Sequence, residues 1–250
     1  MKNLLVAQSG GPTSAINATL AGVIENALSS PSVDKIYGSV NGIQGVLNEN
    51  LIDLKTKITN VSELNLLCQT PASALGSCRV KLKDPAVCAD EYETIISVLR
   101  KYNIDCFIYI GGNDSMDTVS KLSRYAETVN SEIRFIGIPK TIDNDLVLTD
   151  HTPGFGSAAK YVASTVREIA IDASVYDNKK SVTIVEIMGR HAGWLAAASV
   201  LARKFEGDNP VLIYLPEVAF DQEQFLADVQ KAFEHTSNPV SYTHLRAHET

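Results

Sequence analysis

Two apolar runs each end in a glycine pair, Gly10-Gly11 after the first and Gly111-Gly112 after the second. Bare backbone N–H groups at such strand-to-turn points can approach a phosphate group. Either pair alone is better explained as a tight turn. The second pair leads into Asp114, and a carboxylate beside a phosphate site costs free energy unless a metal ion or a lysine offsets it.

Further polar residues stand where other apolar runs end. Lys140 precedes Asp143 by three residues, and Asp145 follows on the same stretch. Taken alone, residues 143–145 are better explained as a solvated or helix-capping loop, and Arg79 could be a surface arginine. The polar clusters are Gly10-Gly11, Gly111 to Asp114, Lys140 to Asp145, Met188 to Arg190, and Glu217. Together they offer a cradle, a cation, Mg²⁺ ligands and a base, which are the groups that phosphoryl transfer needs.

Hydrophobic spacing predicts strands that alternate with helices. The expected strands are residues 3–11, 33–40, 104–112, 133–140, 181–189 and 210–217. The expected helices are residues 13–30, with a Thr or Ser cap, then 91–103, 116–129, 156–174, 192–205 and 222–235, whereas 41–84 is expected to be irregular. Apolar strands separated by helices predict an α/β fold with parallel sheets covered on both faces. Ligands in such folds bind at the carboxyl ends of strands, where the polar clusters lie.

The composition is that of an ordinary globular protein: 250 residues, 45% hydrophobic and 20% charged. The net charge of −7 argues against nucleic acid or an anionic membrane as the main partner. No apolar run reaches the length that spans a bilayer. The four cysteines lack CxxC or metal-binding spacing, so we interpret them as reduced thiols of a cytoplasmic protein.

Several motifs resemble the phosphofructokinase family in their order and spacing. They are "SGG" at 9–11, "GGNDS" at 111–115, "PKTIDND" at 139–145, "TDHTPGFGSA" at 149–158, "VEIMGRHAGWLA" at 185–196 and "LPEV" at 215–218. The resemblance covers about residues 1–235, and "PKTIDND" with "MGRHAG" is highly specific. It implies two Rossmann-like parallel-sheet domains: residues 1–139 with the phosphate-donor site, and 140–240 with the sugar-phosphate site.

More narrowly, the chain looks like the pyrophosphate-dependent branch of the family. ATP-dependent bacterial members typically read "GGDGS" and "PGTIDND", so Asp114 and Lys140 stand here where those members have glycine. A charged side chain at Asp114 would occupy the space of a nucleotide's α-phosphate and repel it, while Lys140 would attract the shorter pyrophosphate. Unit charges about 4 Å apart interact by roughly 4 kcal/mol at an effective dielectric near 20, before desolvation.

The resemblance implies Mg²⁺-dependent, reversible phosphoryl transfer from pyrophosphate to the 1-hydroxyl of fructose 6-phosphate, a step of glycolysis. Asp143 matches the general base, Thr141 would hydrogen-bond the transferring phosphate, and Arg79 and Arg190 would neutralise developing charge. The implied donor-binding residues are Gly11, Arg79, Gly112, Asp114, Ser115 and Lys140. The implied sugar-phosphate residues are Thr141, Asp143, Asp145, Met188, Gly189, Arg190 and Glu217, and the implied metal ligands are Asn113 and Asp145.

Two positions depart from the family pattern. Asn113 stands where members usually have a metal-binding aspartate, and its amide brings no charge to the ion. A family arginine that reaches the sugar phosphate of a neighbouring subunit falls at Ser181, with Lys179 or Lys180 as possible substitutes. The resemblance also implies a homo-oligomer, a dimer or tetramer, for the full-length protein.

The carboxyl end departs most. Family members continue with another strand and a "GxxQRGG"-type segment that binds the sugar phosphate, whereas here the apolar pattern vanishes after Val240. Residues 241–250, "SYTHLRAHET", resemble a translated sequencing-adapter tail on a truncated reading frame; the alternative is a genuine divergent terminus. We therefore expect the strand after residue 239 to be missing, and the 250-residue chain to fold poorly and to be inactive.

Other functions stay open at this point. An ATP-dependent phosphofructokinase is one, because some ATP users in the family also carry "PKTIDND". A non-catalytic regulatory subunit is another, although such a subunit would be free to lose Asp143 and Asp145. NAD and lipid kinases share "GGN/D" turns, but they lack "MGRHAGW" and "PEV".

Overall fold

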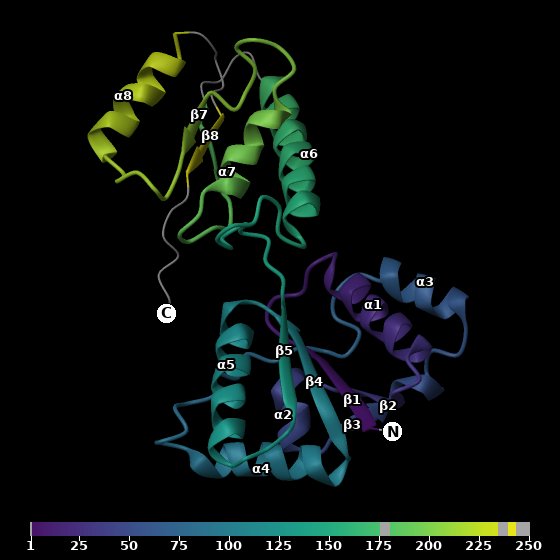
Figure 1. The fold of residues 1–250 in the computed structure, drawn as a ribbon. Coiled ribbons are helices and arrows are strands. Elements are labelled where there is room, and N and C mark those ends of the chain that lie inside the picture. Colours follow the sequence, from purple (N-terminus) through teal and green to yellow (C-terminus); the bar gives the residue numbers. More distant parts are fainter. Residues whose placement is uncertain (1, 176–180, 235–239, 244–250) are drawn as a thin grey trace. The chain divides into compact units, whose positions relative to one another are not determined.

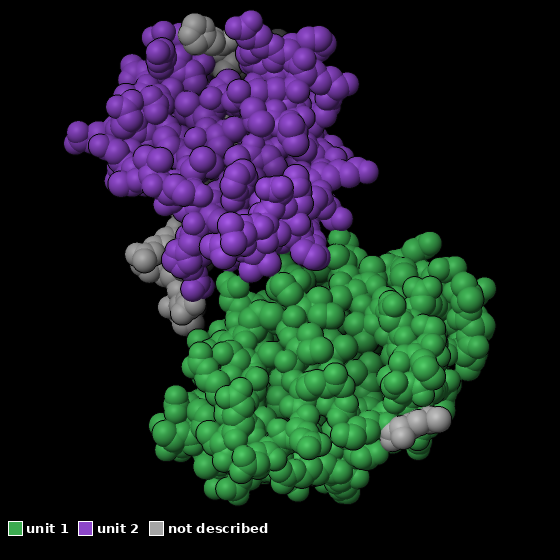
Figure 2. Space-filling model, in the orientation of Figure 1, with its two compact units in different colours: residues 1–141 green, residues 142–250 purple. Residues whose placement is uncertain are grey.

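The computed structural model of the chain describes residues 2–175, 181–234 and 240–243, the last range by its backbone only. The chain divides into two compact units, residues 1–141 and residues 142–250 (Figure 2). The assignment of a donor site to residues 1–139 and of a sugar-phosphate site to residues 140–240 stays a prediction.

Unit 1 is built on a five-stranded sheet with the order β3-β2-β1-β4-β5. The strands are β1 (Lys2–Gln8), β2 (Val33–Ser39), β3 (Leu51–Asp53), β4 (Ile104–Gly111) and β5 (Arg134–Pro139). All neighbours are parallel except β2 and β3, which pair antiparallel. The helices are α1 (Ile16–Ser29), α2 (Gly42–Leu47), α3 (Val61–Gln69), α4 (Ala89–Lys101) and α5 (Asn113–Thr128), with a 3₁₀ turn at Leu54–Thr56.

Alternation along β1 divides the core of unit 1 into two layers. Leu4 and Val6 pack with α1 and α3 on one face of the sheet. Leu5 and Ala7 pack with α2, α4 and α5 on the other face (Figure 1). Because successive side chains of a strand point to opposite faces, one apolar run serves both layers. The predicted α/β sheet with helices on both faces is confirmed for this unit.

The strand order of unit 1 reverses between β1 and β4. From β1 the chain continues to β2 on one side of the sheet, whereas β4 lies against β1 on the other side. Connections that leave in opposite directions open a crevice outside the carboxyl ends of such strands, and ligands of open α/β sheets bind there. The pair Gly10-Gly11 follows β1, and the pair Gly111-Gly112 lies at the end of β4, so both pairs adjoin this crevice.

Unit 2 carries a parallel sheet of three described strands, β6 (Thr183–Glu186), β7 (Leu212–Tyr214) and β8 (Val240–Thr243), in the order β6-β8-β7. Its helices are α6 (Phe155–Ser174), α7 (Trp194–Ala198) and α8 (Gln222–Ala232), with a 3₁₀ turn at Ser199–Ala202. The core gathers Val166, Ile187, Leu195, Ala196 and Ala202. No helix in the described parts of the chain is both long and apolar enough to cross a membrane.

The expectation that no strand forms after residue 239 is wrong. Val240–Thr243 forms β8, which pairs with β6 through Thr183 and with β7 through Leu212. A ladder of backbone hydrogen bonds needs no apolar alternation, and this short run contains β-branched and aromatic residues that favour strands. Residues 244–250, the rest of the predicted foreign tail, lie outside the described residues.

The expectation that residues 41–84 are irregular is also wrong, because α2, β3 and α3 lie there. The first two elements are too short for a periodic pattern to register. Helix α3 did carry a signal: Asn60 accepts a hydrogen bond from the Glu63 N–H (3.0 Å), and Glu63 accepts one from the Thr59 N–H (2.6 Å). Such reciprocal capping marks a helix start.

The predicted Thr or Ser cap of the first helix is wrong as well. Helix α1 begins at Ile16 after Ala15, which makes no side-chain cap hydrogen bond. The Thr13 carbonyl already accepts a hydrogen bond from the Ile16 N–H (3.4 Å), so a turn separates Thr13 from the helix proper. The Thr13 hydroxyl is buried and has no hydrogen-bond partner among the described residues.

Leu5→Ala tests the two-layer core of unit 1. Leu5 is fully buried in β1, so we expect its truncation to lower the free energy of unfolding by about 2–5 kcal/mol. Val61→Ala removes an exposed side chain from α3 and should change it by less than about 0.5 kcal/mol. Urea denaturation followed by circular dichroism measures both; equal, small effects would contradict the packing of β1 described above.

Candidate functional site

The turn after β1 depends on a glycine and approaches Lys140. Gly10 has a φ of +77°, a backbone conformation that side chains disfavour. A Cβ at Gly10 would lie 3.3 Å from the Lys140 Nζ. The Ser9 N–H donates to the Ile110 carbonyl (2.9 Å), which extends the β1–β4 ladder by one residue. The turn is therefore held against the end of β4, and a side chain at Gly10 would be strained by its φ and in tight contact with Lys140.

The turn after β4 runs directly into α5. A Cβ at Gly111 would lie 2.1 Å from the Oγ of Ser115, which is buried, so glycine lets the chain enter the helix at this angle. Gly112 is the N-cap and supplies no side chain, so the first-turn N–H groups of this 16-residue helix are not capped by it. Helix N-termini of this kind favour anions.

Helix α5 begins at Asn113, three residues before the predicted start at residue 116. Asn113 and Asp114 therefore lie in its first turn, and not in a loop. A carboxylate in the first turn interacts favourably with the helix dipole. This interaction stabilises the Asp114 carboxylate. It offsets part of the free-energy cost that a carboxylate beside a phosphate site would carry.

Lys140 connects the ends of three strands. It follows β5, and its backbone N–H donates to the Gly111 carbonyl (2.9 Å) at the end of β4. Its Nζ donates to the carbonyl of Gly11, in the turn after β1. The residue is only 5% exposed, although its side chain is charged. A buried ammonium needs hydrogen-bond acceptors, and the glycine turn provides one.

Asp114 has a cationic neighbour that sequence analysis missed. Its carboxylate lies 3.3 Å from the Lys81 Nζ, and its side chain is 73% exposed. Lys81 belongs to the run "CRVKLK", where three basic residues within five positions were an available signal. Arg79 in the same run is exposed. The structure therefore places Lys81 beside Asp114, while Lys140 is bound to the β1 turn.

Cys78 lies against the turn after β1. Its carbonyl accepts hydrogen bonds from the Gly10 N–H (3.3 Å) and the Ser9 hydroxyl (3.2 Å). Burial acts to raise the pKa of the Cys78 thiol, but hydrogen bonds from nearby backbone N–H groups and from Tyr109 outweigh it. The pKa of Cys78 therefore lies below its ordinary value, which increases the thiolate fraction near neutral pH.

The stretch after Lys140 is organised around Asn144. Asn144 is buried with a φ of +57°; its Nδ2 donates to the Asp150 carbonyl (3.0 Å), and its Oδ1 accepts from the Thr152 N–H (2.9 Å). These bonds close the loop that carries the two predicted carboxylates. Asp143 is half-buried and Asp145 is exposed. The middle residue of "DND" is thus a structural residue that orients its neighbours.

In unit 2 the motifs "MGRHAGW" and "LPEV" meet through one hydrogen bond. The Gly193 N–H, just before α7, donates to the Oε1 of Glu217 (2.7 Å). A Cβ at Gly193 would lie 2.7 Å from the other oxygen of Glu217 and 2.9 Å from side-chain carbons of Leu215 and Pro216. Glycine at this position therefore lets Glu217 dock, and Glu217 has a structural partner besides any ligand.

The predicted residues after β6 lie in a second turn that requires glycine. Gly189 has a φ of +141°, and a Cβ there would lie 2.4 Å from the Ala192 carbonyl oxygen. The turn leaves Met188 67% exposed and Arg190 exposed. Met188 and Tyr161 line an apolar hollow of about 260 Å³ beside α6 and β6.

The structure brings together some predicted residues and leaves others in separate units. Gly11, Gly112, Ser115 and Lys140 gather at the carboxyl ends of β1, β4 and β5, with Thr141 next in the chain. Of the two predicted metal ligands, Asn113 belongs to unit 1 and Asp145 to unit 2. Ser181 is exposed, whereas Lys179 and Lys180 lie outside the described residues.

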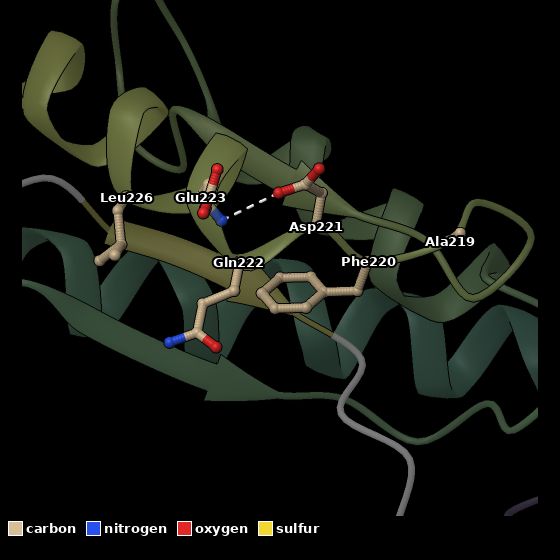
Figure 3. A pocket seen from close by; sticks show the side chains of 6 residues that line it. All are labelled: Ala219, Phe220, Asp221, Gln222, Glu223 and Leu226. Atoms are coloured by element: carbon tan, nitrogen blue, oxygen red, sulfur yellow. Dashed lines mark hydrogen bonds between the residues drawn. The ribbon is translucent and has the colours of Figure 1, made fainter.

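A separate open hollow of about 740 Å³ lies at the start of α8 (Figure 3). It is lined by Ala219, Phe220, Asp221, Gln222, Glu223 and Leu226. The Asp221 carboxylate accepts hydrogen bonds from the N–H groups of Glu223 (2.9 Å) and Gln224 (3.0 Å), so it caps the helix. None of the predicted site residues lines this hollow.

Comparison with known proteins identifies the class. The sequence model of the phosphofructokinase family matches residues 3–243, and the chain belongs to this family. A pyrophosphate–fructose 6-phosphate 1-phosphotransferase from Xanthomonas campestris pv. campestris (strain B100) is 51% identical over 233 residues, which are 93% of this chain and 55% of that protein. The chain thus spans about half the length of this curated relative.

Two crystal structures of pyrophosphate-dependent phosphofructokinases are similar to the chain. The protein from Nitrosospira multiformis has a TM-score of 0.89 and 42% identity, over 98% of this chain and 60% of that one. The protein from Marinobacter aquaeolei has a TM-score of 0.87 and 42% identity, over 99% and 61%. The predicted phosphofructokinase fold and the resemblance to the pyrophosphate-dependent branch are confirmed.

Gly193→Ala tests the connection between the two motifs of unit 2. The added methyl group must displace Glu217 or the backbone, so we expect a loss of about 1–3 kcal/mol in the stability of this unit. Gly156→Ala is the matched control, because it adds the same methyl group in open space in the first turn of α6. It should be neutral or stabilising by up to about 1 kcal/mol. Thermal unfolding of both variants decides; destabilisation of equal size would refute the contact.

Proposed function

We propose that the complete protein transfers a phosphoryl group reversibly between pyrophosphate and the 1-hydroxyl of fructose 6-phosphate. The observation that carries this proposal is the pair of charged residues, Asp114 and Lys140, at the strand ends of a phosphofructokinase fold. Both adjoin the glycine turns at the point where strand order reverses. The relatives at 42–51% identity whose names state pyrophosphate as the phosphoryl donor support the same reading.

The donor is proposed to bind at the turns after β1 and β4. Open space beside Gly11, where an added Cβ would meet nothing within 4 Å, gives the donor access to the backbone. The N-terminal N–H groups of α5 and the Lys140 ammonium supply positive potential. Asp114 sets the length limit, because its carboxylate would repel a further phosphate group. Arg79 and Lys81 extend the basic surface of this unit.

The acceptor is proposed to react with the help of Asp143. As general base, Asp143 takes the proton of the sugar 1-hydroxyl while the oxygen forms a bond to the terminal phosphorus atom of pyrophosphate. The bond from that phosphorus to the bridging oxygen breaks, and orthophosphate leaves with the bridging oxygen. The products are fructose 1,6-bisphosphate and orthophosphate. Thr141 and Arg190 hold the phosphoryl oxygens, and Met188, Gly189 and Glu217 contribute to the sugar-phosphate site.

Mg²⁺ fits the donor chemistry of the predicted ligands. No group of three His, Cys, Asp or Glu side chains in the described residues could hold a metal ion. Mg²⁺ does not require one, because it commonly takes one or two protein oxygens, with substrate phosphates and water completing the shell. Asn113 and Asp145 each offer an oxygen on an exposed side chain. The ion would neutralise charge on the phosphates.

The protein's assembly and location are proposals of the same kind. In a homo-oligomer, Lys179 or Lys180 of a neighbouring subunit would supply the cation that Ser181 does not provide. A substrate pair of soluble metabolites fits a cytoplasmic enzyme. Size-exclusion chromatography with light scattering measures the assembly of the full-length protein; a monomer would refute it.

The donor assignment is tested with pyrophosphate and ATP side by side. Because the chain spans about half of its relative, the assay uses a chimera that continues with the carboxyl-terminal part of the Xanthomonas campestris protein. We expect pyrophosphate to support turnover far better than ATP. Asp114→Gly should raise kcat/KM for ATP by about tenfold or more, equivalent to 1.4 kcal/mol, and Lys140→Gly should lower kcat/KM for pyrophosphate.

Asp117→Gly controls for the loss of an acid and the gain of a glycine in the same helix. Asp117 lies one turn further along α5 and pairs with Lys121 (2.7 Å). The substitution should leave the ratio of kcat/KM for ATP to kcat/KM for pyrophosphate unchanged. Equal wild-type turnover with ATP and pyrophosphate would refute the donor assignment and would favour an ATP-dependent enzyme. No turnover with either donor would favour a regulatory subunit.

Asp143→Ser tests the base. Removing a general base typically costs about 10² to 10⁴ in rate, so kcat should fall steeply while KM for both substrates changes little. The same chimera and coupled assay measure both constants. Asp150→Ser is a suitable control, since Asp150 is an exposed acid of the same loop. A raised KM with kcat intact would reassign Asp143 to binding.

A further inference from the structure

A buried polar network lies behind the glycine turn of unit 1, outside the residues that the motifs marked. Gln8 is the last residue of β1 and Asn17 the second residue of α1, and both are completely buried. The Gln8 Nε2 donates to the Ile16 carbonyl (3.1 Å) and to the Asn17 Oδ1 (2.9 Å). A carbonyl can only accept, so the bond to Ile16 fixes which way the Gln8 amide faces.

The other end of the Gln8 amide holds the segment 70–79. Its Oε1 accepts from the Leu75 N–H (2.9 Å) and lies 2.9 Å from the Ser73 hydroxyl. Asn17 holds the same segment at two further points: its Nδ2 donates to the Thr70 carbonyl (2.9 Å), and its Oδ1 accepts from the Ala74 N–H (2.9 Å). Two side chains thus anchor the segment over six residues.

The anchored segment in turn holds the turn after β1. The Ser77 hydroxyl donates to the Gly10 carbonyl (2.5 Å), and the Gly10 N–H donates to the Cys78 carbonyl (3.3 Å). Arg79 is the next residue. A shift of the segment would therefore move both hydrogen-bond partners of Gly10, the Ser77 hydroxyl and the Cys78 carbonyl, together with the arginine of the predicted donor site.

The segment does not adopt this path by local preference. Ala72 has a φ of +67°, which costs free energy for a residue with a side chain. Gly76 has a φ of +70°, and a Cβ there would lie 2.2 Å from the Asn41 Oδ1. Such a conformation persists only where surrounding interactions fix it. The hydrogen bonds from Gln8 and Asn17 are interactions that fix the segment in this way. A buried polar network whose members are hydrogen-bonded specifies a unique geometry.

We propose that Gln8 and Asn17 are positioning residues for the donor site, because they hold the 70–79 segment, with Arg79, against the glycine turn after β1. The description of this site as a donor site rests on the function proposed above. The hydrogen-bonded arrangement itself does not.

The test replaces Gln8 with methionine, which has nearly the same shape but none of the amide groups, in the chimera used for the donor assay. Ile24→Ala is the matched control: Ile24 is fully buried in α1, in the apolar layer, and makes none of these hydrogen bonds. Cys78 is the reporter, because its thiol lies on the segment, 3.7 Å from the Tyr109 hydroxyl. A thiol reagent followed by peptide mass spectrometry gives its labelling rate separately from those of Cys68, Cys88 and Cys106.

We expect Gln8→Met to raise the Cys78 labelling rate by about tenfold or more and to weaken the binding of inorganic pyrophosphate by about tenfold in calorimetry, a change of 1.4 kcal/mol. Ile24→Ala should lower the melting temperature at least as much as Gln8→Met does. Its Cys78 labelling rate and its pyrophosphate affinity should stay within about twofold of wild type. If Gln8→Met does not fold, Ser73→Ala removes one hydroxyl from the same network, and a several-fold rise in Cys78 labelling is expected from it.

The outcomes separate the two proposals. If Gln8→Met or Ser73→Ala labels Cys78 no faster than Ile24→Ala does, the network is ordinary core and the positioning role is wrong. If wild type does not bind pyrophosphate while Cys78 labelling responds as expected, the segment is positioned as described and the donor assignment fails. If labelling rises but pyrophosphate affinity stays at wild type, the segment moves without consequence for the site, and the positioning role is again wrong.

Discussion

A buried lysine sets the geometry of the strand ends in unit 1, on which the proposed donor site depends. The ammonium of Lys140 donates to the Gly11 carbonyl, and its backbone N–H donates to Gly111. A charge at 5% exposure is expensive unless acceptors surround it, so the turns must approach closely. Such an approach requires glycine at position 10, because a Cβ there would crowd the Lys140 Nζ. It also requires that β1, β4 and β5 end in register.

This arrangement changes the view of the two charged positions that separate the branches of the family. From sequence alone, Lys140 and Asp114 were two charges acting on one donor: the lysine would attract pyrophosphate, and the aspartate would repel a nucleotide's α-phosphate. In the structure Lys140 also serves the fold, whereas Asp114 is exposed in the first turn of α5 and lies beside Lys81. An exposed ion pair is screened and contributes little to stability. Under the proposed function, the Asp114 carboxylate would be the group that repels a longer donor.

Sequence predicted the elements that carry a periodic signal, and it failed where structure depends on long-range partners. The apolar runs of β1, β4 and β5 and the amphipathic spacing of α4 and α6 were sufficient to place those elements. Helix α2 and strand β3 are too short for such a pattern. Glycine motifs located the turns, because glycine there answers a local steric need. The motif residues were found, while the contacts that hold them were not.

The contacts that sequence missed share one property: the two partners lie far apart along the chain. Gln8 bonds to Leu75, which is 67 residues away, and nothing in the local pattern of β1 distinguishes it from a strand-end polar residue. Glu217 bonds to Gly193, which is 24 residues away. In each unit a polar side chain anchors a glycine-containing turn through backbone groups. Glycine makes the close approach possible, and the distant side chain determines which approach is taken. A motif therefore marks where chemistry is placed, and long-range hydrogen bonds to its backbone fix the geometry in which that chemistry can occur.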